Sequence, residues 1–515
     1  MRNVFSMKLS GMEGIPVNVE VSMQDSGVGI HLVGLADAAV KESLLRTVTA
    51  IQAKGFTFPG KKTIINLAPA DLRKSGNGYD LPIALAIIAE SNQFPGLNDL
   101  EKWIVLGELG LDGSVREVPG CVQAVRMALD SDYGYKGVII PKANGPEVAR
   151  LFANLVPVYG VANLMDALCV ISNPTGLKTV WEEYLETPTP PRRQKSVFDS
   201  LSESSKRALE IAAAGGHHVL IIGPLGSGRT MFARALVEIL PRMSVNDIID
   251  VAAVYSAADR GLNRVETGQE CRPLRTPHVS ASIAAMLGGG IGEMPSPGEV
   301  SLAHNGVLYM DEFNAIPKSL GLSLKNAMLE KKVVISRLKS KVTYPADFQF
   351  VGSLDSCPCG HYGDGIDGHC QCTPKQRQAW MGLIGQSPVY PMIDVHVWAH
   401  NAVPSQESAD DVEQVAERVA NARLMQNRRY ADEPGIRLNR DLNAADTDSY
   451  CHLDDDCYNL LQTIIERLGL SSTSLLHILR VARTIADLEM SEEIKREHIA
   501  EAASWRFLDR EPATL

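Results

Sequence analysis

The sequence predicts an α/β protein in which two α/β domains are followed by a helical one. Three observations lead to this prediction. Residues 1–172 alternate strand-like and helix-like patterns, residues 219–230 have the pattern of a strand, a glycine-rich turn and a helix start, and helical periodicity dominates from residue 404 onward. The length of 515 residues is enough for roughly three or four domains.

The first domain, residues 1–172, shows its expected strands and helices in turn. Apolar residues alternate with polar ones, or form short runs, in four stretches that we expect to be strands: 17–23, 27–34, 61–69 and 136–144. Apolar residues recur at helical spacing in two stretches, 37–55 and 79–93, and the first of these stops at a glycine. This order predicts a mixed α/β domain.

A proline-rich, charged segment, residues 186–195, predicts an exposed linker, whose limits we place at 173–198. The second domain, 199–403, opens with serines suited to cap a helix, then the helix, an apolar strand and the glycine-rich turn. The third domain, 404–515, is predicted to be helical from four periodic stretches: 411–426, 457–469, 472–489 and 495–508.

The stretch VLIIGPLGSGRT, residues 219–230, has the outline of a phosphate-binding loop, G-x-x-x-x-G-K-[ST], with arginine in place of lysine. Glycines let backbone N–H groups turn toward phosphate oxygens, and the following helix adds the positive end of its dipole. The hydroxyl of Thr230 is suited to bind Mg²⁺. A glycine turn without a ligand is the alternative. The predicted nucleotide-binding residues are Gly223, Pro224, Gly226, Ser227, Gly228, Arg229, Thr230 and Met231.

A second motif, GVLYMDEFN at 306–314, favours the nucleotide site over the empty turn. A mostly apolar strand ends there in two adjacent carboxylates, Asp311 and Glu312, which we predict to be catalytic. Asp311 would hold Mg²⁺ and Glu312 would orient the attacking water. An acidic strand end on the surface is the alternative. Arg229 keeps the charge of the usual lysine but not its shape, so we expect binding to survive better than phosphoryl transfer.

Four of the nine cysteines form two C-x-C pairs across a glycine-rich stretch: Cys357, Cys359, Cys370 and Cys372. Two such pairs can converge on one tetrahedral ion, and zinc is the ion that we expect. His361 and His369 are alternative ligands. Two disulfides or four free thiols are the other interpretations. Four thiolates would leave no open position on the metal, so its role would be structural.

The chain carries a net charge of −11, so any contact with nucleic acid would have to come from a local basic surface. Residues 331–351 read as a β-hairpin with Arg337, Lys339 and Lys341 near its tip. A basic tip suits contact with DNA phosphates, and a solvated charged turn is the alternative. The glycine run 287–299 is predicted to be a mobile loop.

Apolar segments of membrane-spanning length are not found. A span needs roughly 18–20 apolar residues, and no run approaches this length. The start of the chain lacks the apolar core of a secretion signal. We therefore expect a cytoplasmic protein with no membrane partner.

Six motifs together resemble the magnesium-chelatase-like AAA+ proteins of the ComM/YifB family, over nearly the full length. They are GLADAAVKES, NLAPADLRKSGNGYDLPIAL, GPLGSGRTMFARAL, PGEVSLAHNGVLYMDE, CPCGHYGD with CQCTP, and ILRVARTIADL. The resemblance implies a Lon-protease-like, S5-like amino-terminal domain, an AAA+ P-loop α/β core and an α-helical C-terminal lid. It also implies ATP and Mg²⁺ as cofactors, a hexameric ring, and a motor acting on DNA, in particular branch migration in recombination and transformation.

Four departures from the family pattern predict weakened or lost ATP hydrolysis. Arg229 replaces the loop lysine, and Asp355 replaces a sensor asparagine, where its charge would repel the γ-phosphate. Met392 and Thr473 replace two arginines that resemble a trans-acting finger and a second sensor, and such arginines supply orders of magnitude in rate. We expect a homo-hexamer, or a mixed ring in which a paralogue restores the arginines.

Two other functions remain open. One is a nucleotide-gated scaffold or regulatory subunit that does no work on DNA. The other is a magnesium chelatase motor subunit, against which the Lon-like first domain argues. That domain is not expected to be a peptidase, because Lon-type sites use a serine–lysine pair and Gly78 and Val122 stand at those positions. Its predicted role is structural or as an interaction surface.

Overall fold

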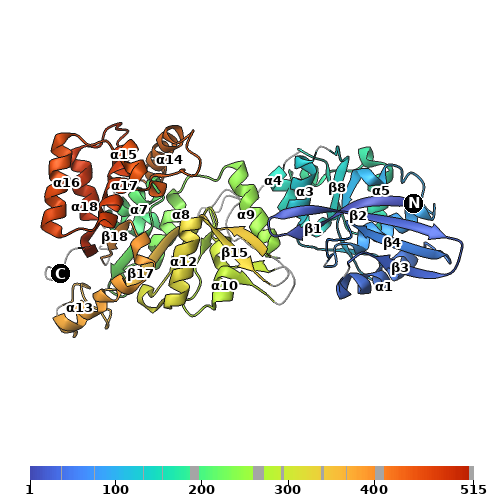
Figure 1. Ribbon diagram of the computed structural model, residues 1–515, viewed down its shortest axis with the longest axis horizontal. Helices are drawn as coiled ribbons and strands as arrows, with labels where there is room; N and C mark the ends of the chain where they lie inside the picture. The colour runs from blue at the N-terminus through green and yellow to red at the C-terminus, as the bar shows by residue number, and fades with distance from the viewer. Residues whose placement is uncertain are drawn as a thin grey trace.

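The computed structural model places three units along the chain, which we name the amino-terminal unit, the central unit and the helical unit (Figure 1). The amino-terminal unit occupies one end of the long axis, and the helical unit packs on the central unit at the other end. The described residues are 1–35, 37–74, 76–131, 133–152, 155–185, 196–258, 272–290, 295–337, 341–366, 368–400 and 411–509.

The amino-terminal unit is built on a seven-stranded mixed sheet in the order β3-β4-β2-β1-β5-β8-β9. Strands β1, β2 and β4 pair antiparallel, and the other neighbours pair parallel. The alternation in the sequence is visible in β2, which buries Val17, Val19 and Val21 on one face. The strands are β1 Arg2–Ser10, β2 Glu13–Gln24, β3 Gly29–Val33, β4 Lys62–Ala68, β5 Trp103–Val105, β8 Gly137–Pro141 and β9 Val158–Val161, with a small pair β6 Glu108–Leu109 and β7 Val115–Arg116.

Helices complete the core of the amino-terminal unit. Helix α2 is apolar nearly all round, and ten of its residues are buried against the sheet and the neighbouring helices α1 and α5. Helix α6 packs on α4 and buries Val180, so this part of the chain is folded. Residues 186–195 lie outside the described residues. The helices are α1 Ala38–Ala53, α2 Asp80–Glu90, α3 Cys121–Asp130, α4 Gly145–Phe152, α5 Leu164–Ser172 and α6 Val180–Leu185.

The central unit contains a five-stranded sheet in the order β11-β14-β17-β10-β18, and every pairing in it is parallel. Strand β10 is apolar throughout and fully buried, as expected where helices cover both faces of a parallel sheet. Because the strands are parallel, the loops at their carboxyl ends meet at one edge. The strands are β10 Val219–Gly223, β11 Leu274–Arg275, β14 Val307–Met310, β17 Gln349–Asp355 and β18 Val395–Trp398.

Within its described residues, the central unit adds seven α-helices and two small hairpins to this sheet. Hairpin β15–β16 pairs Lys332–Ser336 with Lys341–Pro345, where the sequence predicted one, and β12 Gly288–Gly289 pairs with β13 Ser296–Pro297. The helices are α7 Glu203–Gly215, α8 Arg229–Ile239, α9 Val245–Ala257, α10 Ile283–Leu287, α11 Glu299–Leu302, α12 Lys318–Glu330 and α13 Pro374–Gly382.

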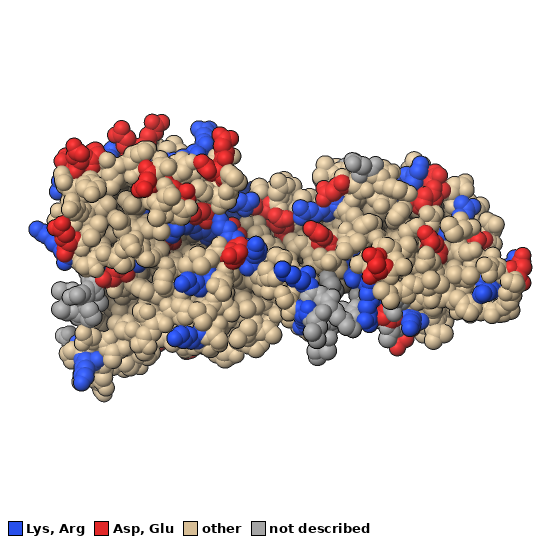
Figure 2. Space-filling view, in the orientation of Figure 1, with Lys and Arg blue, Asp and Glu red and all other residues tan. Residues whose placement is uncertain are grey.

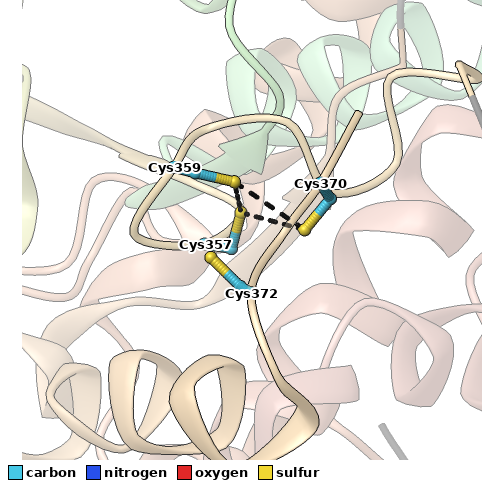
Figure 3. Close-up of side chains that lie close together, drawn as sticks. All are labelled: Cys357, Cys359, Cys370 and Cys372. Atoms are coloured by element: carbon cyan, nitrogen blue, oxygen red, sulfur yellow. Dashed lines mark hydrogen bonds between the residues drawn. The ribbon is translucent and has the colours of Figure 1, made fainter. Parts of the chain in front are cut away.

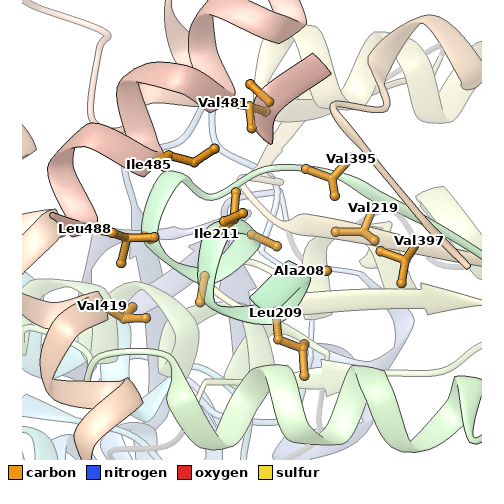
Figure 4. Close-up of a cluster of buried hydrophobic side chains, with 14 of the residues drawn as sticks. Ala208, Leu209, Ile211, Val219, Val395, Val397, Val419, Val481, Ile485 and Leu488 are labelled. Atoms are coloured by element: carbon orange, nitrogen blue, oxygen red, sulfur yellow. The ribbon is translucent and has the colours of Figure 1, made fainter. Parts of the chain in front are cut away.

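The helical unit shares one hydrophobic core with the central unit. Apolar residues of α14 and α17 pack on α7 and on the edge of the sheet, where Val419, Ile485 and Ile211 meet (Figure 4). This core fixes the helical unit against the sheet. The helices are α14 Val412–Arg429, α15 Ala444–Tyr450, α16 Asp455–Leu468, α17 Ser472–Leu488 and α18 Arg496–Ser504. No helix of the described ranges combines the length and apolarity that crossing a bilayer requires.

Helix α9 of the central unit joins the amino-terminal unit through helix α3. The buried side chain of Gln123 donates from Nε2 to the carbonyl oxygen of Ala253 at 2.8 Å, and Gly120 N donates to the Ser256 hydroxyl at 3.1 Å. Ala252 and Ala253 lie in the same hydrophobic cluster as residues of α3 and β8. A buried polar contact next to an apolar cluster therefore links the two units.

Candidate nucleotide site and cysteine cluster

The predicted phosphate loop connects β10 to α8 at the carboxyl edge of the central sheet. Gly226 and Gly228 have φ of 80° and 77°, a backbone conformation that favours glycine. A Cβ on Gly223 would lie 2.6 Å from Ser227 Oγ and 2.7 Å from the Ala399 carbonyl oxygen, so only glycine can occupy this position. The loop residues also include Pro224, whose carbonyl accepts from Ser227 N at 3.2 Å, and Met231, which is exposed on α8.

The two predicted catalytic acids directly follow strand β14. In the sheet, β17 lies between β14 and β10, the strand that leads into the phosphate loop. Asp311 and Glu312 are both exposed, and the Glu312 backbone N donates to Asp311 Oδ1 at 2.9 Å. Glu312 has a positive φ of 51°, an uncommon conformation for a non-glycine residue that is frequent at functional sites. The parallel order therefore brings the acids to the same sheet edge as the loop.

A chain of hydroxyl groups connects Thr230 to Asp311. Tyr309 Oη lies 3.4 Å from Thr230 Oγ1 and 2.8 Å from Ser353 Oγ, and Ser353 Oγ donates to Asp311 Oδ1. Burial raises the pKa of Tyr309, so its hydroxyl stays protonated. We did not predict Tyr309 and Ser353 from the sequence. Ser353 carried a signal, because it is a polar residue among the buried residues in the middle of β17.

Arg229 and Asp355, the two substituted residues of the site, form an ion pair with each other. Arg229 Nη2 lies 2.5 Å from Asp355 Oδ1, and Arg229 Nη1 donates to the carbonyl oxygen of Gly223 at 2.8 Å. The Arg229 side chain is only 12% exposed and that of Asp355 34%. Asp355, at the end of β17, therefore holds the Arg229 guanidinium and neutralises its charge. Strand β17 is the neighbour of β10, which leads into the phosphate loop.

The other two substituted positions supply no cation to this edge. Met392 is half-buried and packs against the hydrophobic cluster formed by β10, β14, β17 and α12. Thr473 is exposed in the first turn of α17. In the amino-terminal unit, Val122 is fully buried and Gly78 has open space beside it. Neither of these two residues carries a group that could act in catalysis.

The four cysteines of the C-x-C pairs converge, and Figure 3 shows their sulfur atoms pointing toward one another. Sγ of Cys370 lies 3.8 Å from Sγ of both Cys357 and Cys359, which are 3.3 Å apart, and all four sulfurs lie within 4.8 Å of one another. A tetrahedral ion with metal–sulfur bonds of about 2.3 Å requires sulfurs about 3.8 Å apart. The cluster, completed by Cys372, thus has the geometry of a metal site.

Hydrogen bonds within the cluster favour one thiolate. The backbone N–H of His361 and the neighbouring thiols lower the pKa of Cys359 to about 6, whereas burial raises that of Cys372 to about 11. The alternative ligands His361 and His369 do not join the cysteine cluster but lie together with Asp364. Their Nδ1 atoms lie 3.4 Å and 2.6 Å from Oδ2 of Asp364, and the three side chains form a separate group.

The cysteine segment also contacts the phosphate loop directly. The carbonyl oxygen of Gly360 accepts from the backbone N–H of Leu225 at 2.8 Å. Gly360 has φ of 78°, and a Cβ there would lie 2.7 Å from Leu225 Cγ. The cluster therefore positions the outer turn of the loop.

The predicted basic hairpin ends next to the predicted glycine loop. Arg337 Nη2 donates to the carbonyl oxygen of Gly290 at 2.5 Å, and Lys341 pairs with Ser336 at the start of β16. Lys339 lies outside the described residues, as do residues 291–294 of the glycine run. The described part thus brings two of the three predicted DNA-contacting residues to one tip.

Comparison with known proteins covers nearly the whole chain. Family models described as "Magnesium chelatase, subunit ChlI", "Subunit ChlI of Mg-chelatase" and "Magnesium chelatase, subunit ChlI C-terminal" match residues 199–407, 19–144 and 409–506. The uncharacterized protein YifB of Salmonella typhimurium is 35% identical over 97% of this chain and 96% of its own length. Competence protein ComM of Haemophilus influenzae is 34% identical over 98% and 97%.

A more distant similarity covers a smaller part of the chain. The magnesium-chelatase 67 kDa subunit of Chlorobaculum parvum is 28% identical over 29% of this chain and 22% of that protein. YifB and ComM, in contrast, match from end to end at more than 30% identity. The chain therefore belongs to the magnesium-chelatase-like family that includes YifB and ComM.

Proposed function

We propose that this protein binds a magnesium nucleotide at the phosphate loop, hydrolyses it weakly or not at all, and acts on DNA as part of a ring. The Arg229–Asp355 ion pair is the observation that carries this proposal. An arginine that already pairs with a carboxylate and donates to the Gly223 carbonyl offers a phosphate a neutralised charge and only its remaining N–H donors. The ion pair with Asp355 therefore reduces the contribution of Arg229 to stabilising the transition state of phosphoryl transfer.

The remaining residues fit a nucleotide. The left-handed glycines and the N-terminus of α8 supply backbone N–H groups for phosphate oxygens. Thr230 and Asp311 would hold Mg²⁺, which would neutralise phosphate charge, and Glu312 would orient water. Tyr309 and Ser353 connect Thr230 to Asp311 and keep these two proposed ligands in one polar network.

The wider architecture in this proposal follows the family. The amino-terminal unit would be a Lon-protease-like, S5-like domain without the catalytic dyad, and the helical unit would be the lid of an AAA+ module. The subunits would assemble as a homo-hexamer or as a mixed ring with a paralogue. In such a ring the basic hairpin tip, with Arg337 and Lys341, would contact DNA phosphates without reading sequence.

Zinc is the proposed metal of the cysteine cluster. The sulfur separations of 3.8 Å match a tetrahedral Zn–S₄ site, and four thiolates would leave no position for substrate. The ion would fix the segment whose Gly360 carbonyl holds the Leu225 N–H. Its role would therefore be to shape the phosphate loop.

A nucleotide-gated scaffold without motor activity is the second candidate. The exposed Thr473 and the half-buried Met392 favour it, because neither can replace an arginine in the transfer step. A chelatase motor subunit is disfavoured, since the magnesium-chelatase 67 kDa subunit matches only 29% of this chain, whereas YifB and ComM match 97% and 98% of it.

One purified sample decides between these candidates. ATP–Mg²⁺ affinity is measured by calorimetry, and phosphate release is measured with and without single- and double-stranded DNA. Micromolar binding with slow, DNA-stimulated release would support the DNA-acting ring. Binding with no release, unchanged in Arg229→Lys, would support the scaffold. An absence of ATP binding in the folded protein would refute both.

A further inference from the structure

A basic pocket of about 410 Å³ opens at the edge of the central sheet opposite the phosphate loop. Its lining includes Gly306, just before β14, and Gln349, the first residue of β17, so it lies at the amino ends of these strands. Helix α14 forms its other wall. Figure 2 shows charged side chains of both signs gathered in the hollow between the helical and central units. The charged lining residues are Arg242, Asp247, Arg272, Asp347, Arg423, Arg437 and Arg440.

Two of these guanidinium groups form no ion pair among the residues that the structure describes. Arg423 donates from Nε to the Ala213 carbonyl oxygen at 2.8 Å, and its two terminal nitrogens make no other hydrogen bond within the described chain. Arg272 donates to the carbonyl oxygens of Pro241 and Asn305 at 2.9 and 2.8 Å. Backbone carbonyls hold both side chains in place, and the carboxylates of Asp247 and Asp347 act on them through space without direct contact.

The carboxylates of the pocket are already engaged. Asp347 pairs with Arg440, whose side chain is only 10% exposed, and Asp247 lies 3.7 Å from Arg437 at the rim. Among the described lining residues, guanidiniums outnumber carboxylates by five to two. Burial, followed by the charges of Arg272 and Arg440, lowers the pKa of Arg423, and the nearby carboxylates of Asp347 and Asp247 offset this only in part.

We propose that this pocket binds a small anion that carries at least two phosphate groups. Guanidinium groups bind phosphate through paired N–H donors, and carbonyl-anchored arginines present their remaining donors in a fixed direction. Two phosphate groups carry roughly three negative charges at pH 7, which suits a lining whose described residues have more guanidiniums than carboxylates. The cavity volume falls within the range of small-ligand sites.

The ligand would bridge two units. Arg423 belongs to α14 of the helical unit, whereas Arg272 belongs to the central unit. An anion between them would connect the helical unit to the sheet at a point remote from the phosphate loop. Binding would therefore raise the thermal stability of the contact between the two units.

The test uses full-length protein and inorganic pyrophosphate, titrated by calorimetry at constant ionic strength. Arg423→Gln and Arg272→Gln should each weaken binding roughly tenfold or more, because each removes charge-assisted donors. The exposed rim variant Arg437→Gln, which leaves the core intact, should weaken it about threefold. Arg428→Gln removes the same charge from α14 outside the pocket and should bind like the unmodified protein.

Three results would overturn the proposal. The first is a pyrophosphate affinity in folded Arg423→Gln or Arg437→Gln equal to that of Arg428→Gln. The second is sulfate binding as tightly as pyrophosphate. The third is a loss of pyrophosphate binding in Thr230→Ala, which would place the anion at the phosphate loop. Unaltered binding in Thr230→Ala would support the pocket even if the loop binds no nucleotide.

Discussion

Replacing Asp355 by asparagine should strengthen ATP binding, because this change releases the Arg229 guanidinium. The pair, 2.5 Å apart, neutralises Arg229 and occupies its Nη2, so a phosphate must compete with Asp355 for this guanidinium. A hydrogen bond between charged groups contributes roughly 1.5–3 kcal/mol, and the partial exposure of Asp355 places this one near the lower limit. About 1.4 kcal/mol released to binding corresponds to a tenfold lower Kd for ATP.

The assay is calorimetric titration of ATP–Mg²⁺ into four folded proteins: the unmodified chain, Asp355→Asn, Arg229→Lys and the double variant. Without nucleotide, Asp355→Asn should unfold at lower denaturant concentration, because Arg229 loses its partner. A double-mutant cycle should give a coupling of about 1 kcal/mol or more between the two residues. Glu330→Gln, an exposed charge change at the end of α12, is the matched control. Unchanged or weaker ATP binding in Asp355→Asn would refute the reasoning.

Three further outcomes are expected. The protein should purify with about one zinc per chain by mass spectrometry, and Cys372→Ser should lose it while Cys169→Ser, an exposed thiol outside the cluster, keeps it. Burial lowers the pKa of His218 to about 3. The unfolded chain therefore binds more protons below pH 6.5, and stability against urea should fall by about 2 kcal/mol between pH 7 and pH 5; a constant stability would contradict this. Gln123→Ala leaves the Ala253 carbonyl without its donor and should cost about 1–3 kcal/mol in unfolding experiments. Gln52→Ala on the exposed face of α1 should change stability by less than about 0.5 kcal/mol, and equal losses in the two variants would contradict the interface.

Local patterns predicted most strands and helices because burial imposes a period on the sequence. Alternation in 17–23 became β2, the apolar run after His218 became β10, and the serines before α7 include its N-cap, Ser202. The glycines of the phosphate loop and the two C-x-C pairs could also be recognised in the sequence, since each feature lies within a few neighbouring residues. Such signals need no knowledge of which strands are neighbours.

Contacts between residues that are far apart along the chain could not be predicted from the sequence. The sequence suggested that Asp355 would repel a phosphate, and it gave no sign that Asp355 neutralises Arg229, which lies 126 positions earlier. Tyr309 read as one of the apolar residues of its strand, yet its hydroxyl connects Thr230 to Ser353. These contacts depend on β17 lying between β14 and β10, an order that no local pattern encodes.

The sequence by itself determined the family, the secondary structure of the sheets and the residues able to cradle a phosphate or hold a metal, because these depend on residue type and short spacing. Only the tertiary structure decided that the loop arginine pairs with Asp355, that the Gly360 carbonyl holds the loop, and that Arg272 and Arg423 meet at the far edge of the sheet. The physical reason is that charges act through space, and a parallel sheet joins residues that are distant along the chain.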